Sequence, residues 1–377
     1  MPDDRNGAVN SFDVAVVGGG MVGSAIAYGL ARRQRSVAVL DEGDVAFRAA
    51  RGNFGLVWVQ GKGAQMPAYA ALTRRSSDAW PAFADELSKT TGVDLEYRRP
   101  GGVDICFDDE SLAAREAMLS RMDRETDGGF PFEILEHGPL ADLLPGIGPK
   151  VAGGSYCPLD GDANPLHLLR ALQAGFIGLG GDYRAEHRVR SIAPNNGGFT
   201  VNCDGRTITA GKVVLAAGLG NATLAPSLGL RAPVGPQRGQ ILVSERLAPV
   251  LPLPTGIVRQ TGAGAMQFGD SVEDVGFDDG TTSTVMGIIA HRAVTAFPYL
   301  RDVRVVRAWG ALRVMTPDGF PVYEQSAAHP GAYLACCHSG VTLAAGHGGE
   351  IADWIAGDNP PANLDALSPD RFDVQAA

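Results

Sequence analysis

The stretch that most constrains this chain runs from residue 12 to residue 42. The hydrophobic run 12–17 predicts a buried strand, and it leads into the turn 18–23 (GGGMVG), which fits the pattern G-x-G-x-x-G. The residues after the turn place apolar side chains on one face at helical spacing. A second apolar strand, 37–40, ends in Asp41. This order of strand, glycine turn, helix, strand and acid predicts a Rossmann-like unit that binds a dinucleotide.

Each position of the motif has a physical role in such a site. Gly18 allows the tight turn, and Gly20 lets the backbone approach a pyrophosphate. Gly23 lets the helix pack close to the strand. The helix starts at Met21 and Val22, where free backbone N–H groups face the phosphates.

The acid that follows the second strand completes the pattern. Asp41 is placed to accept hydrogen bonds from a ribose hydroxyl. The motif alone does not separate FAD from NAD. A tight turn in an α/β protein without a ligand is the alternative interpretation.

The composition sets the broad class of the protein. At 377 residues the chain exceeds the length of one simple core, so we expect two domains. The net charge is −10 and no Lys/Arg run occurs, so we expect no nucleic-acid partner. The sequence has no stretch of about 18 uncharged apolar residues, so we expect no membrane span.

The N-terminal segment and the cysteines indicate a cytoplasmic protein. Residues 1–11 are polar and acidic, and they lack the basic and apolar regions of a secretory signal. The five cysteines form no C-x-x-C pattern, so we expect no metal site. An odd number of cysteines without a signal fits reduced thiols in the cytoplasm.

The rest of the chain predicts two kinds of sheet. The apolar run 213–218 is similar in character to the first strand and is expected in the same sheet. Residues 233–300 alternate with turns, which predicts an antiparallel sheet in a second domain. A final buried strand is expected at 333–337, followed by a helix at 341–355. Other expected elements are a loop at 46–63, two strands around a Pro-Gly-Gly turn at 97–107, helices at 67–90, 111–122 and 166–174, a crossover between domains at 145–165, strands at 183–192, 199–203 and 305–312, and a turn at 316–319.

Five stretches, in order, resemble a known family. They are the motif at 18–23, the loop 51–57, the VVLAAG strand at 213–218, WGALR leading to TPDG at 309–319, and HSGVTL at 338–343. Over residues 12–357 the chain resembles the FAD-dependent oxidoreductases of the D-amino-acid oxidase (DAO) family, which includes glycine oxidase, sarcosine oxidase and D-amino-acid dehydrogenase. Within it, ARGNFGLVWVQGKG and CCHSGVTLA look most like the β-subunits of opine oxidases and hydroxyproline dehydrogenases.

The resemblance implies a fold and a reaction. The expected fold is α/β (α+β), with a glutathione-reductase-like FAD-binding domain that has a mainly parallel sheet, and an antiparallel-sheet substrate domain. We expect the FAD-binding domain at 1–81, 151–222 and 310–377, and the substrate domain at 82–150 and 223–309. The implied reaction oxidises a C–N bond to an imine by hydride transfer from the α-carbon to flavin N5. A neutral amine carries no ammonium proton, so a general base is not obviously needed.

The resemblance also implies a role for particular residues near the substrate. Arg313 matches the family arginine that pairs with the substrate carboxylate, since its planar fork makes two charge-assisted hydrogen bonds. The alternative is a surface ion pair, and Val314 stands where the family often has proline. His338 is predicted either to line the substrate cavity or to be a hydrogen-bonded histidine beneath the helix.

A second set of residues is implied to contact the cofactor. The N–H groups of Gly340, Val341 and Thr342 are expected to face the flavin N1–C2=O edge, where the reduced ring is anionic. The other implied contacts are Asn53, Phe54 and Gly55 along the flavin and pyrophosphate, Arg51 at a phosphate, Val189 at the adenine, and Ala217 with Gly218 as the second nucleotide stretch. For each of these residues a purely structural role is the alternative.

The cysteines predict how FAD is held. Sarcosine oxidases carry a flavin-linking cysteine shortly before the Thr-Pro-Asp turn, whereas residues 311–315 here contain none. Cys336 and Cys337 lie at the end of an apolar strand, where cysteine behaves as a small hydrophobic residue. We therefore expect non-covalent FAD.

Three functions compatible with FAD remain open at this point. The first is a dehydrogenase for a D-amino acid, a proline-like amino acid or an opine, and the second is an oxidase of the glycine or sarcosine type that uses oxygen. The third is an FAD-holding subunit that is inactive without the partner chains of a hetero-oligomeric dehydrogenase. An NAD-dependent dehydrogenase is disfavoured, because a plain NAD domain would lack the segment 338–343.

Overall fold

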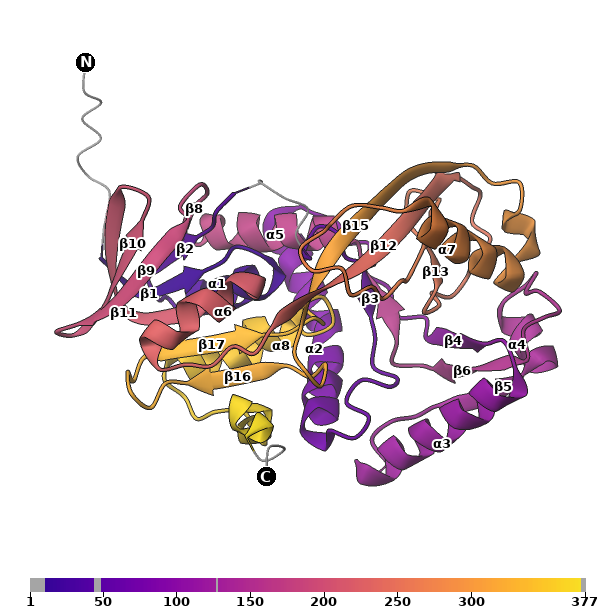
Figure 1. Ribbon diagram of the computed structural model, residues 1–377, viewed down its shortest axis with the longest axis horizontal. Helices are drawn as coiled ribbons and strands as arrows, with labels where there is room; N and C mark the ends of the chain where they lie inside the picture. The colour runs from indigo at the N-terminus through magenta and orange to yellow at the C-terminus, as the bar shows by residue number, and fades with distance from the viewer. Residues whose placement is uncertain (1–10, 44–48, 127, 374–377) are drawn as a thin grey trace, which may run out of the picture.

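A computed structural model describes residues 11–43, 49–126 and 128–373 (Figure 1). The chain forms two lobes, one around an eight-stranded sheet and the other around a four-stranded and a three-stranded sheet. The N-terminal segment 1–11 was predicted not to be a secretory signal, and all of it except Ser11 lies outside the described residues. Part of the predicted loop 46–63 also lies outside them. Among the described residues no helix is long and apolar enough to cross a membrane.

The eight-stranded sheet contains the predicted βαβ unit. β1 (Ser11–Val17) pairs in parallel with β2 (Val37–Leu40) on one side and with β11 (Arg206–Leu215) on the other. The pairing of β11 with β1 confirms that the apolar run from residue 213 shares the first strand's sheet. β17 (Ala332–Cys336) continues the parallel part beside β11. The remaining strands are β8 (Asp182–Arg184), β9 (Val189–Asn195), β10 (Gly198–Cys203) and β16 (Val322–Gln325).

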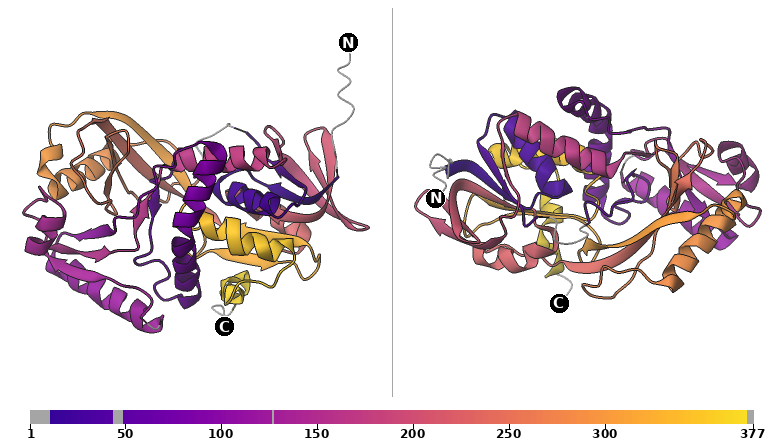
Figure 2. Two further views of the ribbon diagram at one scale, coloured as in Figure 1. Left: turned by 180° about the vertical axis from the view of Figure 1, so that it is seen from behind. Right: turned by 90° about the horizontal axis from the view of Figure 1, so that it is seen from above.

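The parallel strands β1, β2 and β11 each contain a buried apolar stretch (14–17, 37–40 and 213–215) where both faces of the sheet are covered. Val14 and Val16 of β1 lie in the core beneath the helices, whereas Ala15 and Val17 lie in the core on the other face. Helices α1 (Met21–Arg32), α2 (Pro67–Thr91) and α5 (Pro165–Gly178) belong to the first of these layers (Figure 2). The predicted cap of α5 is confirmed, since Asn164 Oδ1 accepts hydrogen bonds from the next two N–H groups, at 3.1 and 3.3 Å.

The C-terminal helical region packs against α1 in the same layer (Figure 2). It consists of α8 (Ala344–Gly346), a π-helical turn (His347–Ile351) and α9 (Ala352–Ala356). A Cβ added at Gly29 of α1 would lie 2.3 Å from the carbonyl oxygen of Gly348, so the glycine is needed for this close crossing.

The second lobe holds the two antiparallel sheets. The four-stranded sheet has the order β13-β14-β12-β15, and the three-stranded sheet has the order β4-β6-β5. β12 (Gly235–Arg246) and β15 (Val305–Met315) are long strands that reach from the first lobe into the second (Figure 1). Further elements are β3 (Leu56–Val57), β4 (Gly102–Cys106), α3 (Asp109–Glu125), β5 (Glu133–Glu136), α4 (His137–Leu143), β6 (Gly153–Cys157), β7 (Gly161–Asp162), α6 (Asn221–Leu224), β13 (Val258–Gln260), β14 (Ala265–Phe268) and α7 (Ser283–Ala296).

Two strand predictions fail where the backbone turns. Of the two strands expected at 97–107, only β4 forms, since Glu96 has a φ of 50° and Arg98 makes just an isolated bridge to Asp162. The strand expected at 183–192 is broken into β8 and β9, and Glu186 between them has a φ of 57°. A left-handed residue interrupts a strand because its φ leaves the extended region.

Three further differences concern longer segments. The region 233–300 contains the helix α7 as well as strands, because Ile289, Ala293 and Ala296 repeat at helical spacing and are buried. The expected crossover at 145–165 includes β6, which pairs with β4 and β5. The helix expected from residue 341 begins at Ala344. The domain boundaries remain a prediction.

Candidate active site

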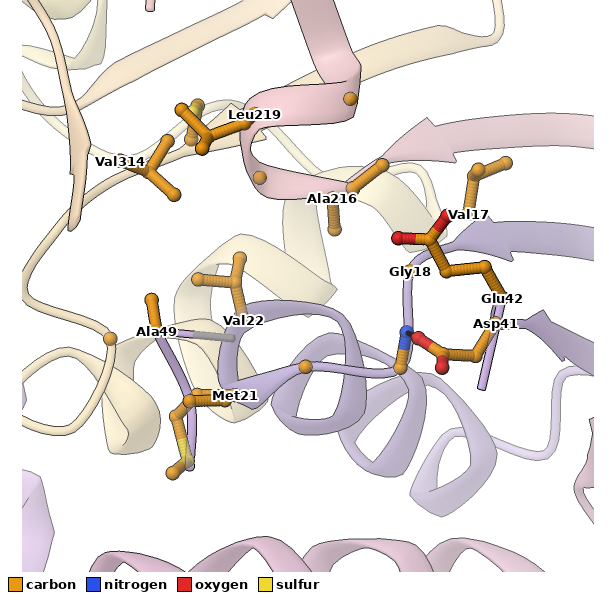
Figure 3. A pocket seen from close by; sticks show the side chains of 18 of the residues that line it. Val17, Gly18, Met21, Val22, Asp41, Glu42, Ala49, Ala216, Leu219 and Val314 are labelled. Atoms are coloured by element: carbon orange, nitrogen blue, oxygen red, sulfur yellow. Dashed lines mark hydrogen bonds between the residues drawn. The ribbon is translucent and has the colours of Figure 1, made fainter. Parts of the chain in front are cut away.

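A cavity of about 590 Å³ lies at the carboxyl ends of β1 and β2 (Figure 3). Its wall includes Gly18 and Gly20 of the motif, and a ligand at this edge of a parallel sheet is where α/β folds place one. Gly18 has a φ of 104°, and a Cβ there would lie 2.5 Å from the carbonyl oxygen of Ala216. A Cβ at Gly23 would lie 1.9 Å from the carbonyl oxygen of Gly18. Both positions therefore require glycine for steric reasons within the protein, whether or not a ligand is bound.

The start of α1 and the acid after β2 meet at this cavity. The first turn of α1 contains no acidic residue and no side-chain cap, so its N–H groups are left for an anion. Asp41 accepts hydrogen bonds from the N–H of Gly19 at 2.7 Å and of Gly43 at 2.9 Å. Asp41 and Glu42 lie beside Gly18, whereas Val314 and Leu219 lie across the cavity from Met21 (Figure 3).

Most of the sequence-predicted cofactor residues line this cavity. Gly340 also packs closely on the start of α1, because a Cβ there would lie 3.2 Å from Met21 Cβ. The predicted residues in the wall are Gly18, Gly20, Met21, Val22, Asp41, Arg51, Asn53, Val189, Ala217, Gly218, His338 and Gly340. Gly23 and Gly55 are outside both this wall and that of the second cavity described below. Gly55 has a φ of 92°, and a Cβ there would lie 2.5 Å from the carbonyl oxygen of Ala163.

A second cavity of about 280 Å³ adjoins the first, and Asn53 and His338 belong to both walls. The strand β15 also contributes to both walls. Leu312 and Val314 line the larger cavity, whereas Ala311 and Arg313 line the smaller one. Other residues of the smaller cavity are Phe54, Trp58, Lys62, Asp270, Ser339, Val341 and Thr342.

Arg313 is half-buried in the smaller cavity, with 23% of its side chain exposed. Its Nη1 donates to the carbonyl oxygen of Ser271 at 2.7 Å and of Arg238 at 3.3 Å, which orients the guanidinium. Its Nη2 lies 3.6 Å from a carboxylate oxygen of Asp270. Burial lowers the pKa of Arg313, and the charges of Asp270 and Glu273 oppose that effect. The arginine remains a cation at any physiological pH.

His338 lies where the two cavities meet. Its Nδ1 is 3.1 Å from Ser339 Oγ. The positive charge of Lys62 holds the pKa of His338 well below its ordinary range, and burial and Arg313 add to this effect. The imidazole is therefore neutral. It lies in the cavity wall, which is what the predicted role of lining the substrate cavity requires.

The segment after His338 is held by side chains of α2 and by the backbone that follows β3. Thr342 Oγ1 accepts a hydrogen bond from the N–H of Trp58 at 3.1 Å, and the Thr342 carbonyl oxygen accepts from Ser76 Oγ at 2.8 Å and Trp80 Nε1 at 3.0 Å. Val341 and Thr342 line the smaller cavity. These bonds fix the backbone that is predicted to face the flavin.

Sequence reasoning missed Lys62, Tyr69, Asp270 and Ser339. Lys62 and Ser339 lie inside stretches that carried the family resemblance, but no local pattern signals that they meet. They contact one another only through the fold, since Lys62 Nζ donates to Ser339 Oγ at 3.0 Å.

Comparison with known proteins identifies the family. A family model described as "FAD dependent oxidoreductase" (DAO) matches residues 13–354. The chain belongs to this family. The predicted family, fold class and FAD cofactor are thereby confirmed, and the protein is an FAD-dependent oxidoreductase.

Two relatives illustrate the range of the family. The chain is 42% identical over 366 residues to a subunit of the opine oxidase of Rhizobium meliloti, covering 97% of this chain and 99% of that protein. It is 29% identical to glycine oxidase of Pseudomonas putida, covering 93% of this chain and 96% of that protein. Among solved structures, glycine oxidase from Geobacillus kaustophilus has a TM-score of 0.88 at 25% identity, covering 96% of this chain and 98% of that one. L-proline dehydrogenase from P. horikoshii has a TM-score of 0.86 at 19% identity, covering 98% of this chain and 99% of that one, and supports the fold alone.

The residues and the volume of the larger cavity are suited to binding FAD. The glycine turn and the uncapped start of α1 suit the pyrophosphate, and the carboxylate of Asp41 suits a ribose. Its volume is within the ~300–1,000 Å³ typical of ligand sites. When bound, FAD supplies the redox chemistry by accepting two electrons, while the protein positions it and the substrate.

Denaturation is expected to release the flavin from the chain. Cys336 and Cys337 line the cavity, but burial raises the pKa of Cys336 to about 12 and raises that of Cys337 further. Thiols in this state are poor nucleophiles toward a flavin ring. Acid precipitation of the holoprotein should leave all yellow colour in the supernatant. Colour that stays with the pellet after washing in denaturant would instead indicate a covalent bond.

Proposed function

We propose that the protein oxidises the C–N bond of a small amino acid or secondary amine to an imine, which water then hydrolyses. The observation that supports this proposal is the position of Arg313, a cation in a cavity of about 280 Å³ that adjoins the proposed FAD cavity. The guanidinium fork suits a carboxylate, and the cavity volume suits a substrate of amino-acid size. The substrate carbon is expected at the junction marked by His338.

The residues of the two cavities have different roles in this reaction. Arg313 binds the carboxylate and orients the substrate. The neutral ring of His338 adds no charge beside the reacting carbon. The backbone of Gly340, Val341 and Thr342 presents N–H groups toward the cofactor, which favours negative charge there.

The relatives suggest which substrates to test. The similarity to the opine oxidase of Rhizobium meliloti supports an opine, and the similarity to glycine oxidase supports a small amino acid. D-amino acids and proline-like amino acids stay in the test panel because the sequence resemblance implied them. The opine oxidase relative is named as one subunit of its enzyme, which supports partner chains in a hetero-oligomer. A cytoplasmic location is also part of this proposal, supported by five cysteines that are buried and free.

Anaerobic spectroscopy of the purified chain tests the proposal. We expect one class in a panel of D- and L-amino acids, prolines, sarcosine and opines to bleach the visible flavin absorbance. Readmitting air then distinguishes an oxygen-using oxidase, which regains colour rapidly, from a dehydrogenase. A holoprotein that no member of the panel bleaches, with or without an artificial dye acceptor, would contradict the proposed activity. That result would favour the alternative of an FAD-holding subunit inactive without its partners, which the name of the opine oxidase relative supports.

A further inference from the structure

Lys62 is a half-buried cation of the smaller cavity with no assigned role. It follows β3 on the loop that leads to α2, and it lines the same cavity as Arg313. Its Nζ donates a hydrogen bond to Ser339 Oγ at 3.0 Å. A lysine amine has three such positions, so this bond anchors Nζ and leaves room for a second partner.

Ser339 connects Lys62 to the junction of the two cavities. Its Oγ accepts from Lys62 Nζ and from Tyr69 OH at 2.8 Å, which leaves its own hydrogen to donate to His338 Nδ1 at 3.1 Å. Ser339 and Tyr69 are buried. These bonds hold Nζ at a defined point in the cavity that Arg313 and His338 also line.

Burial of Lys62 favours its neutral form. The pKa of Lys62 is lowered to about 8, mainly by burial and in part by the charge of Arg313, whereas Cys337, Asp270 and Asp160 oppose the shift. The two carboxylates have other partners. Asp270 lies 3.6 Å from Arg313, and Asp160 Oδ2 accepts from Gln60 Nε2 at 2.7 Å. The titratable groups that face Lys62 from the neighbouring elements are Tyr69 of α2, Asp160 after β6, Asp270 after β14, Arg313 of β15, and Cys337 and His338 after β17.

We propose that Lys62 is the catalytic base that takes a proton from the ammonium group of the bound substrate. The inference rests on the proposed function, because it concerns an amine substrate bound by Arg313. Two ammonium groups in one small cavity repel each other. Binding of an ammonium substrate next to Lys62 therefore favours the loss of one proton from the pair.

The step is a proton transfer between two nitrogens. An N–H bond of the substrate ammonium breaks, an N–H bond on Nζ forms, and the positive charge moves from the substrate to Lys62. The substrate nitrogen regains the lone pair that a C=N bond requires. Lys62 then returns its proton to solvent before the next turnover. No oxidant takes part in this step.

The choice of residue supports this role. The chain has 32 basic residues, of which four are lysines (Lys62, Lys89, Lys150 and Lys212) and the rest, 32 − 4 = 28, are arginines. An arginine at this position would remain protonated, whereas a lysine can give up its proton when desolvated.

Two measurements on the holoprotein test the assignment. With lysine labelled by ¹³C at the ε-carbon, NMR should show a signal that is absent in Lys62→Met and that titrates near pH 8. The rate of flavin bleaching should rise with pH through the same value, because the base must be unprotonated. In Lys62→Met and Lys62→Arg that rise should move to the amine pKa of the free substrate. Their bleaching rate at pH 7 should fall by about 100-fold or more.

The control is Lys89→Met, the same change at an exposed lysine of α2 whose side chain is 75% exposed. It should keep the wild-type pH profile, and flavin absorbance and melting temperature should confirm that all variants fold. A Lys62 signal that titrates near the ordinary ~10.4 overturns the proposal. Bleaching with an unchanged pH profile in Lys62→Met also overturns it while leaving the proposed function intact. If no substrate bleaches the wild type, the proposed function fails and the NMR titration still decides the chemistry of Lys62.

Discussion

Replacing Arg313 by methionine should raise the Kd of an amino-acid substrate by about 100-fold, which corresponds to about 3 kcal/mol. The change removes a guanidinium that the carbonyl oxygens of Ser271 and Arg238 orient in the smaller cavity. Lysine at this position keeps the charge but loses the fork, so an intermediate effect is expected. The Kd follows from the dependence of the anaerobic bleaching rate on substrate concentration.

A matched pair of substrates separates recognition from folding in this experiment. Proline carries the carboxylate that pyrrolidine lacks, so the preference of the wild type for proline should largely disappear in Arg313→Met. Arg307→Met is the control, because Arg307 is an exposed residue of the same strand. An unchanged preference for proline in a variant that retains FAD would show that Arg313 serves a structural ion pair instead.

Replacing Gly23 by alanine should destabilise the protein and weaken FAD binding. The new Cβ would lie 1.9 Å from the carbonyl oxygen of Gly18, and backbone on both sides leaves neither atom free to move away. Forcing α1 away from β1 should cost on the order of 1–3 kcal/mol or more in the free energy of unfolding. It would also displace the N–H groups that face the phosphates.

Gly20→Ala is the informative partner of this variant. Gly20 lines the cavity, and the nearest protein atom to its added Cβ is Ala50 Cβ at 3.8 Å, so the fold has room for it. The melting temperature of the FAD-free protein should therefore fall in Gly23→Ala and stay unchanged in Gly20→Ala. Both variants should bind FAD more weakly by fluorescence titration. Wild-type FAD affinity in Gly20→Ala would contradict the assignment of the glycine turn to the pyrophosphate.

Local patterns predicted the parts of the fold that local sequence determines. The unit from β1 to β2 was predicted because its strands, glycine turn and helix each have their own periodicity within about 30 residues. The helix α7 was missed because β-branched and small residues in a turn-rich region obscured the spacing of Ile289, Ala293 and Ala296. The pairing of β6 with β4 and β5 depends on contacts between distant segments.

The residues of the candidate site were likewise predicted only where a local motif marks them. Arg313 and the segment after His338 were predicted because motifs of the family mark them. Lys62 was missed, since its role depends on the approach of a residue 277 positions away, Ser339. Such a meeting leaves no periodicity in the sequence, and the lowered pKa of Lys62 comes mainly from burial in the folded protein.

The alternation of side chains along β15 has a consequence for how this enzyme can diversify. Positions 311 and 313 open toward the smaller cavity, while positions 312 and 314 open toward the larger one. Substitutions at the first pair can therefore alter substrate preference without changing the wall around FAD. An insertion of one residue would exchange the two sets, because the side-chain period of a strand is two. The long ladder with β12, which pairs Gly235 with Met315 at one end and Ser244 with Val305 at the other, opposes such a slip. New specificities should thus arise by point substitution at alternate positions of β15, with length changes confined to the loops.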